Sequence, residues 1–316
     1  MATQPVDASL EMGHSLPPQK RRSGAKLKLR NTLIGWTFIL PNFIGFAVLT
    51  MIPIITLFYM SLTNWNIFGQ SNWMGLDNYG RLFHDSSFHT AMRNTLFYAA
   101  IHIPLTLAAS LGLAILLNRK MRGVALFRTV AFFPFITSIV AIAAVWNMMF
   151  SPELGVINQF LMWLGIENPP GWTTSTDWSM PAILIVQTWR FMGYYMLLFL
   201  AGLQTVPTEL HEAARMDGAG AWQRFRNVTM PCLRPVTFFV TVMCTINALR
   251  VFDLVLVMTE GGPGQSTLVL TQYIWQLAFV RQPSNFGYAA AVSVVLFAMS
   301  MVVTIIQFVV NKRREA

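Results

Sequence analysis

The sequence is poor in charged residues. Only 11% of its 316 residues are Asp, Glu, Lys or Arg, whereas 54% are hydrophobic and the mean hydropathy is +0.51. A soluble domain carries roughly 25% charged residues, so this composition excludes an ordinary soluble domain. The deficit of charge indicates a protein that is largely embedded in lipid.

Cysteine and histidine are also scarce, with two Cys and five His in the chain. Cys232 falls in a loop and Cys244 in a hydrophobic run, so no disulfide framework is expected. No His or Cys group has the spacing of a zinc site, and the sequence contains no Walker-type phosphate loop, dinucleotide fingerprint or G-x-S-x-G elbow. We therefore expect no catalytic site, metal or cofactor in this chain, and any energy source must lie elsewhere.

Six hydrophobic runs are each long enough to cross a bilayer, since about 20 apolar residues span the hydrocarbon core as a helix. They cover residues 32–62, 94–117, 124–150, 180–203, 235–259 and 287–310. The predicted fold is an all-α polytopic membrane protein, with a six-helix transmembrane domain at 32–310. A flexible basic tail at 1–31 precedes this domain, and a short basic tail at 311–316 follows it. Prolines in the first three runs predict kinks, at Pro41, Pro53, Pro104 and Pro134.

The distribution of Lys and Arg orients these helices, because basic residues are retained on the cytoplasmic side of short loops. Four segments that lie on one side of the predicted bundle are basic. Their residues are Lys20, Arg21, Arg22, Lys26, Lys28 and Arg30; Arg119, Lys120, Arg122 and Arg128; Arg215, Arg224, Arg226 and Arg234; and Lys312, Arg313 and Arg314. The opposite loops hold only Arg81, Arg93 and Arg281. Both termini are therefore predicted to be cytoplasmic.

The net charge of +9 is explained by this topology and requires no nucleic-acid partner. The N-terminal basic cluster is also suited to contact the anionic headgroups of membrane lipids.

The loop at 204–234 is predicted to form a helical hairpin. Thr208 is expected to cap a first helix, and Gly218 to end it in a turn. A second short helix carries an apolar stripe that includes Trp222, and Met230-Pro231 is expected to end it. Such a hairpin either packs under its own bundle or inserts into a groove on a soluble partner, and its residue pattern alone leaves both open.

The same loop resembles the coupling loop of ABC-importer permeases. That pattern is EAA, a Gly six residues after the Glu, and an ending of a hydrophobic residue, two further residues and Pro. Here Glu212, Ala213, Ala214, Gly218 and Pro231 occupy those positions, with Asp217 in the turn. Thr229-Met230 departs mildly from the family, which more often has an aliphatic residue before the Pro. The resemblance implies that these residues couple the chain to an ATPase, with Glu212 meeting a basic residue.

A second stretch is similar to carbohydrate-uptake permeases of the maltose-importer type. It is VFDLVLVMTEGGPGQST at 251–267, and GLDNYGRLF at 75–83 extends the likeness. The resemblance implies a multi-pass protein of a bacterial-type plasma (inner) membrane that forms half of an uptake pathway. A second, different permease and two cytosolic ATPases, which bind ATP and Mg, are the implied partners. An extracellular or periplasmic binding protein would deliver the substrate, an oligosaccharide, disaccharide or related polyol or glycerol-phosphate compound.

Polar residues inside the fourth and fifth runs are the candidates for contacts with substrate, because a buried polar group in a membrane normally faces a cavity or a partner. They are Gln187, Arg190, Tyr194 and Tyr195, followed by Asn247, Arg250 and Asp253. Aromatic faces with amide and guanidinium donors suit a sugar. Two alternatives stay open: Arg250 and Asp253 form a structural pair, or the two tyrosines belong to an interfacial belt.

Two other classes of function were weighed. An ion-coupled secondary transporter would show a buried relay of carboxylates or His, or inverted halves with broken helices. Only His102 and Asp253 lie near the predicted spans. An intramembrane enzyme would need a nucleophile and base or a metal cluster, and no such group is evident. The ABC permease is therefore the main hypothesis, with the secondary transporter as its alternative.

Overall fold

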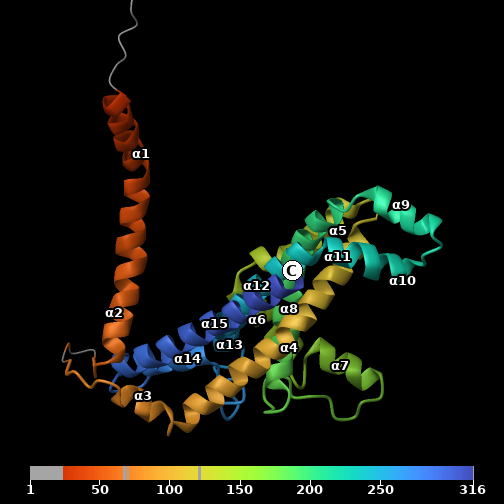
Figure 1. Ribbon diagram of the computed structural model, residues 1–316. Helices are drawn as coiled ribbons and strands as arrows, with labels where there is room; N and C mark the ends of the chain where they lie inside the picture. The colour runs from red at the N-terminus through yellow and green to blue at the C-terminus, as the bar shows by residue number, and fades with distance from the viewer. Residues whose placement is uncertain (1–23, 67–68, 70, 120–121, 316) are drawn as a thin grey trace, which may run out of the picture. The chain divides into compact units, whose positions relative to one another are not determined.

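The computed structural model describes residues 24–66, 69, 71–119 and 122–315. Within this part of the chain the regular structure is helical throughout, and the only extended pairing is an isolated bridge between Thr63 and Trp73 (Figure 1). A helix satisfies its own backbone hydrogen bonds, as a segment without access to water must. The prediction of an all-α fold is confirmed.

The chain divides into two units, Met1–Thr56 and Leu57–Ala316, which are described separately. The first unit contains α1 (Gly24–Phe46), the π-helical turn η1 (Ala47–Met51) and the start of α2 (Ile52–Ser61). Helix α1 begins inside the segment predicted as a flexible tail, so 24–31 is helical instead. Lys20, Arg21 and Arg22 of the predicted basic cluster lie outside the described residues.

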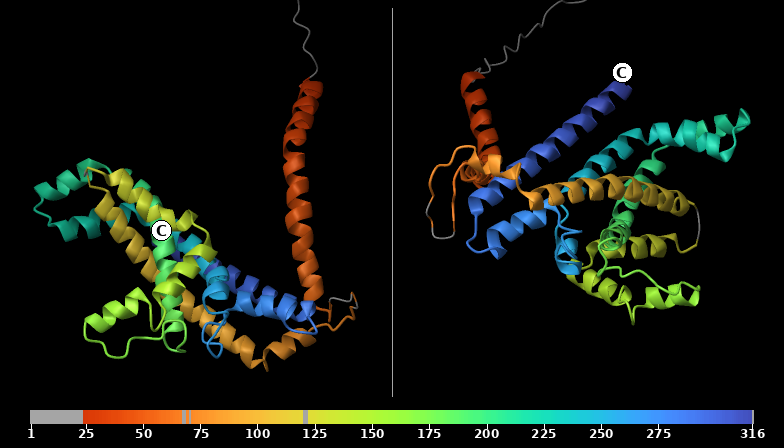
Figure 2. Two further views of the ribbon diagram at one scale, coloured as in Figure 1. Left: turned by 180° about the vertical axis from the view of Figure 1, so that it is seen from behind. Right: turned by 90° about the horizontal axis from the view of Figure 1, so that it is seen from below.

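The second unit holds the remaining helices, several of which are short. They are α3 (Asp77–Leu82), α4 (Ser86–Leu117), α5 (Val124–Ile136), α6 (Ile139–Met149), α7 (Val156–Trp163), α8 (Ser179–Gln204), α9 (Thr208–Met216), α10 (Ala221–Arg224), η2 (Phe225–Thr229), α11 (Met230–Cys232), α12 (Arg234–Leu249), α13 (Asp253–Met258), α14 (Leu270–Trp275), η3 (Gln276–Val280) and α15 (Phe286–Glu315). Helix α8 packs against α4 and α5, and α12 packs against α4, α8 and α15 (Figure 2).

Four helical segments are long and apolar enough to cross a membrane: Ile34–Ser61, Ser86–Leu117, Ser179–Gln204 and Phe286–Arg313. Two bent pairs, α5 with α6 and α10–α11 with α12, pass the same test together, which raises the number to as many as six. The first pair bends by 99° and the second by 70°. The kink predicted at Pro134 is a complete break just after it, where Thr137 adopts an extended conformation.

The run predicted as one span at 235–259 is also divided, and this expectation of a continuous helix is corrected. Helix α12 ends at Leu249 and α13 begins at Asp253, because Phe252 has a non-helical backbone conformation. The hydroxyl of Thr271 donates a hydrogen bond to the carbonyl of Val251. This side chain satisfies a backbone group that the break would otherwise leave unpaired.

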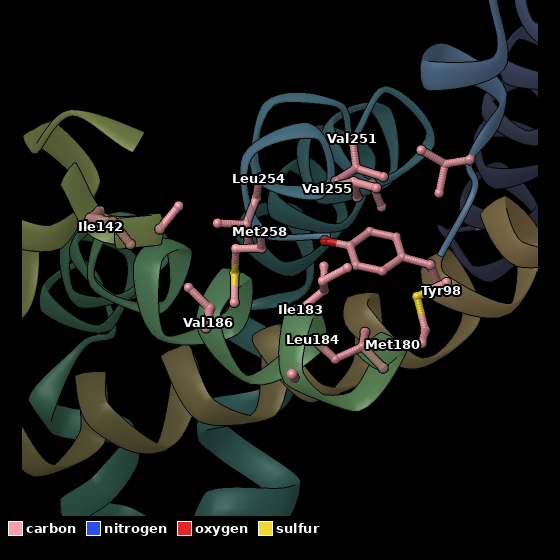
Figure 3. Packing of buried hydrophobic residues seen from close by; sticks show 14 of the residues in the cluster. Tyr98, Ile142, Met180, Ile183, Leu184, Val186, Val251, Leu254, Val255 and Met258 are labelled. Atoms are coloured by element: carbon pink, nitrogen blue, oxygen red, sulfur yellow. The ribbon is translucent and has the colours of Figure 1, made fainter. Parts of the chain in front are cut away.

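The interior of the second unit is built largely where α4, α6, α8 and α13 meet. The ring of Tyr98 lies among Ile183, Val251 and Val255 in one buried apolar cluster (Figure 3). Small residues allow close approach elsewhere: a Cβ atom added to Gly193 of α8 would lie 1.8 Å from the carbonyl oxygen of Ala131 in α5. Glycine therefore permits backbone-to-backbone packing of these two helices.

Candidate coupling loop and substrate pathway

Helices α9 and α10 lie side by side at one end of the second unit and form the hairpin expected at 204–234 (Figure 1). Pro207, rather than Thr208, occupies the N-cap position, and no side chain caps the helix. The predicted capping role of Thr208 is therefore wrong, because Thr208 is already helical. Glu209 in the first turn and Arg215 in the last turn complement the helix dipole.

The corner of the hairpin has a backbone conformation that favours glycine. Gly218 has a φ of +76°, in the left-handed region where an L side chain is strained. The N–H of Ala219 donates to the carbonyl of Ala214 at 2.9 Å, and the Arg224 guanidinium donates to the carbonyl of Ala219 at 2.8 Å. These bonds hold the turn in a single shape, which makes the hairpin a compact element.

The second arm of the hairpin extends further than the sequence predicts. Pro231 lies inside α11, where Met230–Cys232 continues the helix from η2, and the bend of 70° comes only after it. The expectation that Met230-Pro231 ends the arm is corrected to an end at Cys232. Proline is accommodated there because it stands in the first turn of α11, where its missing N–H is tolerated.

The hairpin exposes apolar side chains. Met216 is 90% exposed, Trp222 69% and Leu210 46%. The side chain of Glu212 is exposed as well, and it makes no hydrogen bond or ion pair with a described residue. A solvent-exposed surface that presents such a group of apolar residues beside an unpaired carboxylate is typical of a protein–protein contact. This arrangement favours docking over packing beneath the chain's own bundle.

The candidate substrate residues of α8 and α12 meet at one point. The Asn247 amide donates to the Tyr195 hydroxyl at 3.0 Å, and the side chain of Tyr195 is fully buried. Tyr194 stacks on Phe135 of α5, with ring centroids 4.4 Å apart. None of the seven candidates lines the cavities beside Asp85, beneath the hairpin or between α12 and α15.

Several buried polar atoms close to these residues have no partner within the described structure. They are Gln187 Oε1, Arg190 Nε, Asn147 Oδ1 and Tyr98 Oη. An unsatisfied buried group costs free energy, so such atoms need water or a ligand. Tyr98 was missed by sequence analysis, although a tyrosine within an apolar run is a signal that could have identified it.

Arg250 and Asp253 do not form the structural pair that the sequence left open. Both are exposed, and they lie on opposite sides of the break between α12 and α13. They form no ion pair with each other or with another described residue. The structural-pair alternative is therefore not supported, and Asn247, Arg250 and Asp253 do not belong to one continuous helix.

A buried polar group between α4 and α8 was also not singled out by the sequence. His102 is 1% exposed, and its ring lies 3.3 Å from the hydroxyl of Thr106 and 3.4 Å from that of Thr188. These contacts give the imidazole polar partners inside the bundle. They account for His102 as a packed interhelical residue.

A second polar site lies at the opposite end of the unit from the hairpin, beside a cavity of about 980 Å³. Asp85 caps α4 by accepting from the backbone N–H groups of Ser87 and Phe88. The hydroxyls of Tyr273 and Tyr288 donate to the same carboxylate. Burial alone would raise the pKa of Asp85, but these four donors hold it below its ordinary value.

Comparison with known proteins connects this geometry to a family. Residues 103–316 match the family model described as the binding-protein-dependent transport system inner membrane component. The chain belongs to this family. It is a multi-pass inner-membrane permease, and the resemblance of its hairpin to a coupling loop agrees with that membership. The secondary-transporter alternative is not supported.

Two relatives illustrate the range of this permease family. The lactose transport system permease protein LacF of Rhizobium radiobacter is 38% identical over 300 residues, which cover 93% of this chain and 99% of that protein. The diacetylchitobiose uptake system permease protein NgcF of Streptomyces coelicolor is 32% identical and covers 94% of this chain and 88% of its own length.

A solved structure shares the fold of the permease. One chain of a bacterial ABC transporter that imports the acidic polysaccharide alginate superposes with a TM-score of 0.80, at 23% identity. The superposition covers 92% of this chain and 99% of that chain. The described helices therefore have the arrangement of an ABC-importer permease.

Proposed function

We propose that this permease forms half of an uptake pathway for a disaccharide or short oligosaccharide. The observation that carries the proposal is the 38% identity to a lactose permease over almost the whole of both chains. A relative named for diacetylchitobiose uptake supports the same substrate class. A second, different permease would complete the pathway, and an extracellular or periplasmic sugar-binding protein would deliver the substrate.

The hairpin would transmit force from two cytosolic ATPases. Helix α9 carries the exposed carboxylate of Glu212, which would pair with a basic residue of the ATPase, while Ala213 and Ala214 allow close approach of the two backbones. The hairpin connects directly to α8 at one end and to α12 at the other. Closure of the ATPases would move both helices as rigid bodies and so alternate access to the pathway. ATP and Mg would be bound by those subunits, which leaves this chain without a catalytic step.

The substrate would pass along the faces of α8 and α12 that carry unsatisfied polar groups. Gln187 and Arg190 offer hydrogen-bonding atoms that have no partner among the described residues. Tyr194 offers an aromatic face for the apolar C–H surface of a sugar ring. Tyr195 and Asn247 would hold one another in place beside it, while Arg250 and Asp253 would lie near the entrance.

Reconstitution of the purified transporter in liposomes tests this function. Binding protein would be supplied with lactose, maltose or diacetylchitobiose in turn, and both ATP hydrolysis and uptake of the radiolabelled sugar would be measured. We expect at least one saccharide to stimulate both. A chain that copurifies with no ATPase, and whose uptake is abolished by an ionophore, would contradict the proposal.

A further inference from the structure

A cavity of about 700 Å³ lies between the start of α12 and the end of α15, outside the residues assigned above to the substrate pathway. Its mouth carries Arg226 and Arg234, and none of the described residues that line it is acidic. Both arginines are exposed, and neither makes an ion pair or a hydrogen bond with a described residue. The cavity therefore presents two positive charges that no described side chain neutralises.

The floor of the cavity supplies polar atoms that also lack partners. Thr237 Oγ1 and Gln307 Oε1 are buried, and neither has a hydrogen-bond partner in the described structure. The amide nitrogen of Gln307 is already occupied, because it donates to Thr245 at 2.7 Å. The hydroxyl of Thr237 is thus an available hydrogen-bond donor in the wall of the same cavity that Arg226 and Arg234 line.

The position of the cavity relates it to lipid. It lies at the basic end of α15, beside Lys312 and Arg313, which the distribution of charge assigns to the cytoplasmic side. Apolar side chains on the same helices are exposed next to it, with Phe239 51%, Ile306 55% and Phe308 54% exposed. A polar, positively charged pocket above an exposed apolar surface matches the two parts of a phospholipid.

We propose that this cavity binds the phosphate headgroup of an anionic phospholipid, such as phosphatidylglycerol, from the cytoplasmic leaflet. Arg226 and Arg234 hold the phosphate, the hydroxyl of Thr237 donates to it, and the acyl chains lie along the exposed apolar surface. Arg226 belongs to the second arm of the hairpin, so the bound lipid braces the base of that arm against α15. A docked ATPase is disfavoured as the occupant because Gln307 lies in a helix long and apolar enough to cross a membrane, and Thr237 lies in a bent pair that passes the same test.

Native mass spectrometry of the whole transporter, purified from nanodiscs that contain phosphatidylglycerol and phosphatidylcholine, tests the proposal. This chain is released from the complex in the gas phase, and the lipid that it retains is then measured. Each basic residue near an anionic surface contributes roughly fivefold to binding, so Arg226→Gln with Arg234→Gln should lower phosphatidylglycerol retention by roughly 25-fold. Thr237→Val should lower it further without a change of charge. Arg122→Gln, which removes an exposed basic residue elsewhere on the same side, is the matched control and should retain the lipid.

Four results would overturn the proposal. Equal retention of phosphatidylglycerol by the double variant and the unmodified chain would exclude the site. An equally large loss of phosphatidylglycerol retention in Arg122→Gln would show that the effect depends on general surface charge and not on this cavity. Loss of the ATPase from the double variant with lipid retention unchanged would assign the cavity to the partner protein. An excess of inorganic phosphate should not displace the lipid, and displacement would identify the site as one for free phosphate. Because lipid is counted directly, none of these results depends on which sugar is transported.

Discussion

The hydroxyl of Tyr288 donates a hydrogen bond of 2.6 Å to Oδ2 of Asp85, which joins the start of α15 to the start of α4. Tyr273 of α14 donates to the same oxygen. The carboxylate thus connects α4 to two helices that lie far from it in the sequence. Arg81 lies 4.5 Å from the Tyr288 ring centroid and adds a cation–π contact to this junction.

Replacing Asp85 by Asn should therefore destabilise the protein by about 1–2 kcal/mol near neutral pH, because charged acceptors make stronger hydrogen bonds than neutral ones. The folded-state pKa of Asp85 lies below its unfolded value, so its contribution is fully present above that unfolded value. It is lost as the pH falls through the folded pKa. Thermal unfolding of the detergent-solubilised transporter should show a difference that shrinks below about pH 4.

Asp177→Asn is the matched control for this measurement, since Asp177 is an exposed carboxylate on the same side of the predicted topology. It should change the melting temperature little at any pH. A difference between Asp85→Asn and the unmodified protein that persists undiminished in acid would show that the charge of Asp85 is not what stabilises the junction.

Glu212→Lys should leave the chain inserted in the membrane but abolish sugar-stimulated ATP hydrolysis in the assembled complex. The substitution puts a positive charge where the proposed partner also carries one, so docking is opposed by repulsion. Copurification of the ATPase and stimulated hydrolysis are the two measurements. Glu167→Lys makes the same charge change at an exposed residue of an outer loop and should preserve both. Normal sugar-stimulated ATP hydrolysis in Glu212→Lys would show that Glu212 is not needed for docking of the ATPase.

Gly218→Val should uncouple transport without preventing insertion. A β-branched residue is strained at a φ of +76°, at a cost of about 1–3 kcal/mol, and the hairpin would change shape to relieve it. Apart from Gly218 and its chain neighbours, no described atom lies within 4 Å of the position of an added Cβ, so the strain comes from the local backbone and not from a clash with the rest of the protein. Gly218→Asn is the control, because Asn adopts the left-handed conformation readily. The ratio of sugar taken up to ATP hydrolysed should fall in Gly218→Val and should stay at the value of the unmodified protein in Gly218→Asn.

Tyr194→Ala should impair sugar uptake without lowering basal ATP hydrolysis, because it removes an aromatic face from the proposed pathway. Tyr194→Phe keeps the stacking on Phe135 and should retain most of the uptake. Unchanged uptake kinetics in the Ala variant would show that Tyr194 packs against its neighbours and does not contact the sugar.

Tyr195→Phe and Asn247→Ala should show coupled effects on uptake, since the two side chains share the 3.0 Å hydrogen bond. Interhelical bonds of this kind inside a membrane average about 0.6 kcal/mol in double-mutant cycles, which corresponds to roughly a threefold change. The cycle would be built on the KM for sugar uptake. Strictly additive effects would mean that each residue acts independently of the other.

Local patterns predicted the hairpin well, because its features depend on neighbouring residues. Gly218 forms the corner as predicted, and two short helical arms flank it. The errors fall where backbone geometry outweighs residue type. Thr208 is already helical and so does not cap α9, and Pro231 continues the second arm because the first turn of α11 needs no N–H from it.

In the candidate substrate pathway, too, the sequence shows which residues are polar, whereas their contacts depend on how the helices pack. The sequence identified Tyr195 and Asn247 as polar residues in apolar runs, but their hydrogen bond depends on how α8 meets α12. It placed Arg250 and Asp253 within one continuous run, which the break at Phe252 divides. It did not identify Tyr98, whose unpartnered hydroxyl is recognisable only once its surroundings are known.

The sequence by itself determined that this protein is helical and membrane-embedded, because hydrophobic length and the absence of charge are local properties of the chain. It also determined the hairpin and its resemblance to a coupling loop. Only the tertiary structure decided where the long runs break, which carboxylate joins α4 to α14 and α15, and where two arginines remain without partners. Those features depend on contacts between segments distant in sequence, and each contact is set by the packing of whole helices.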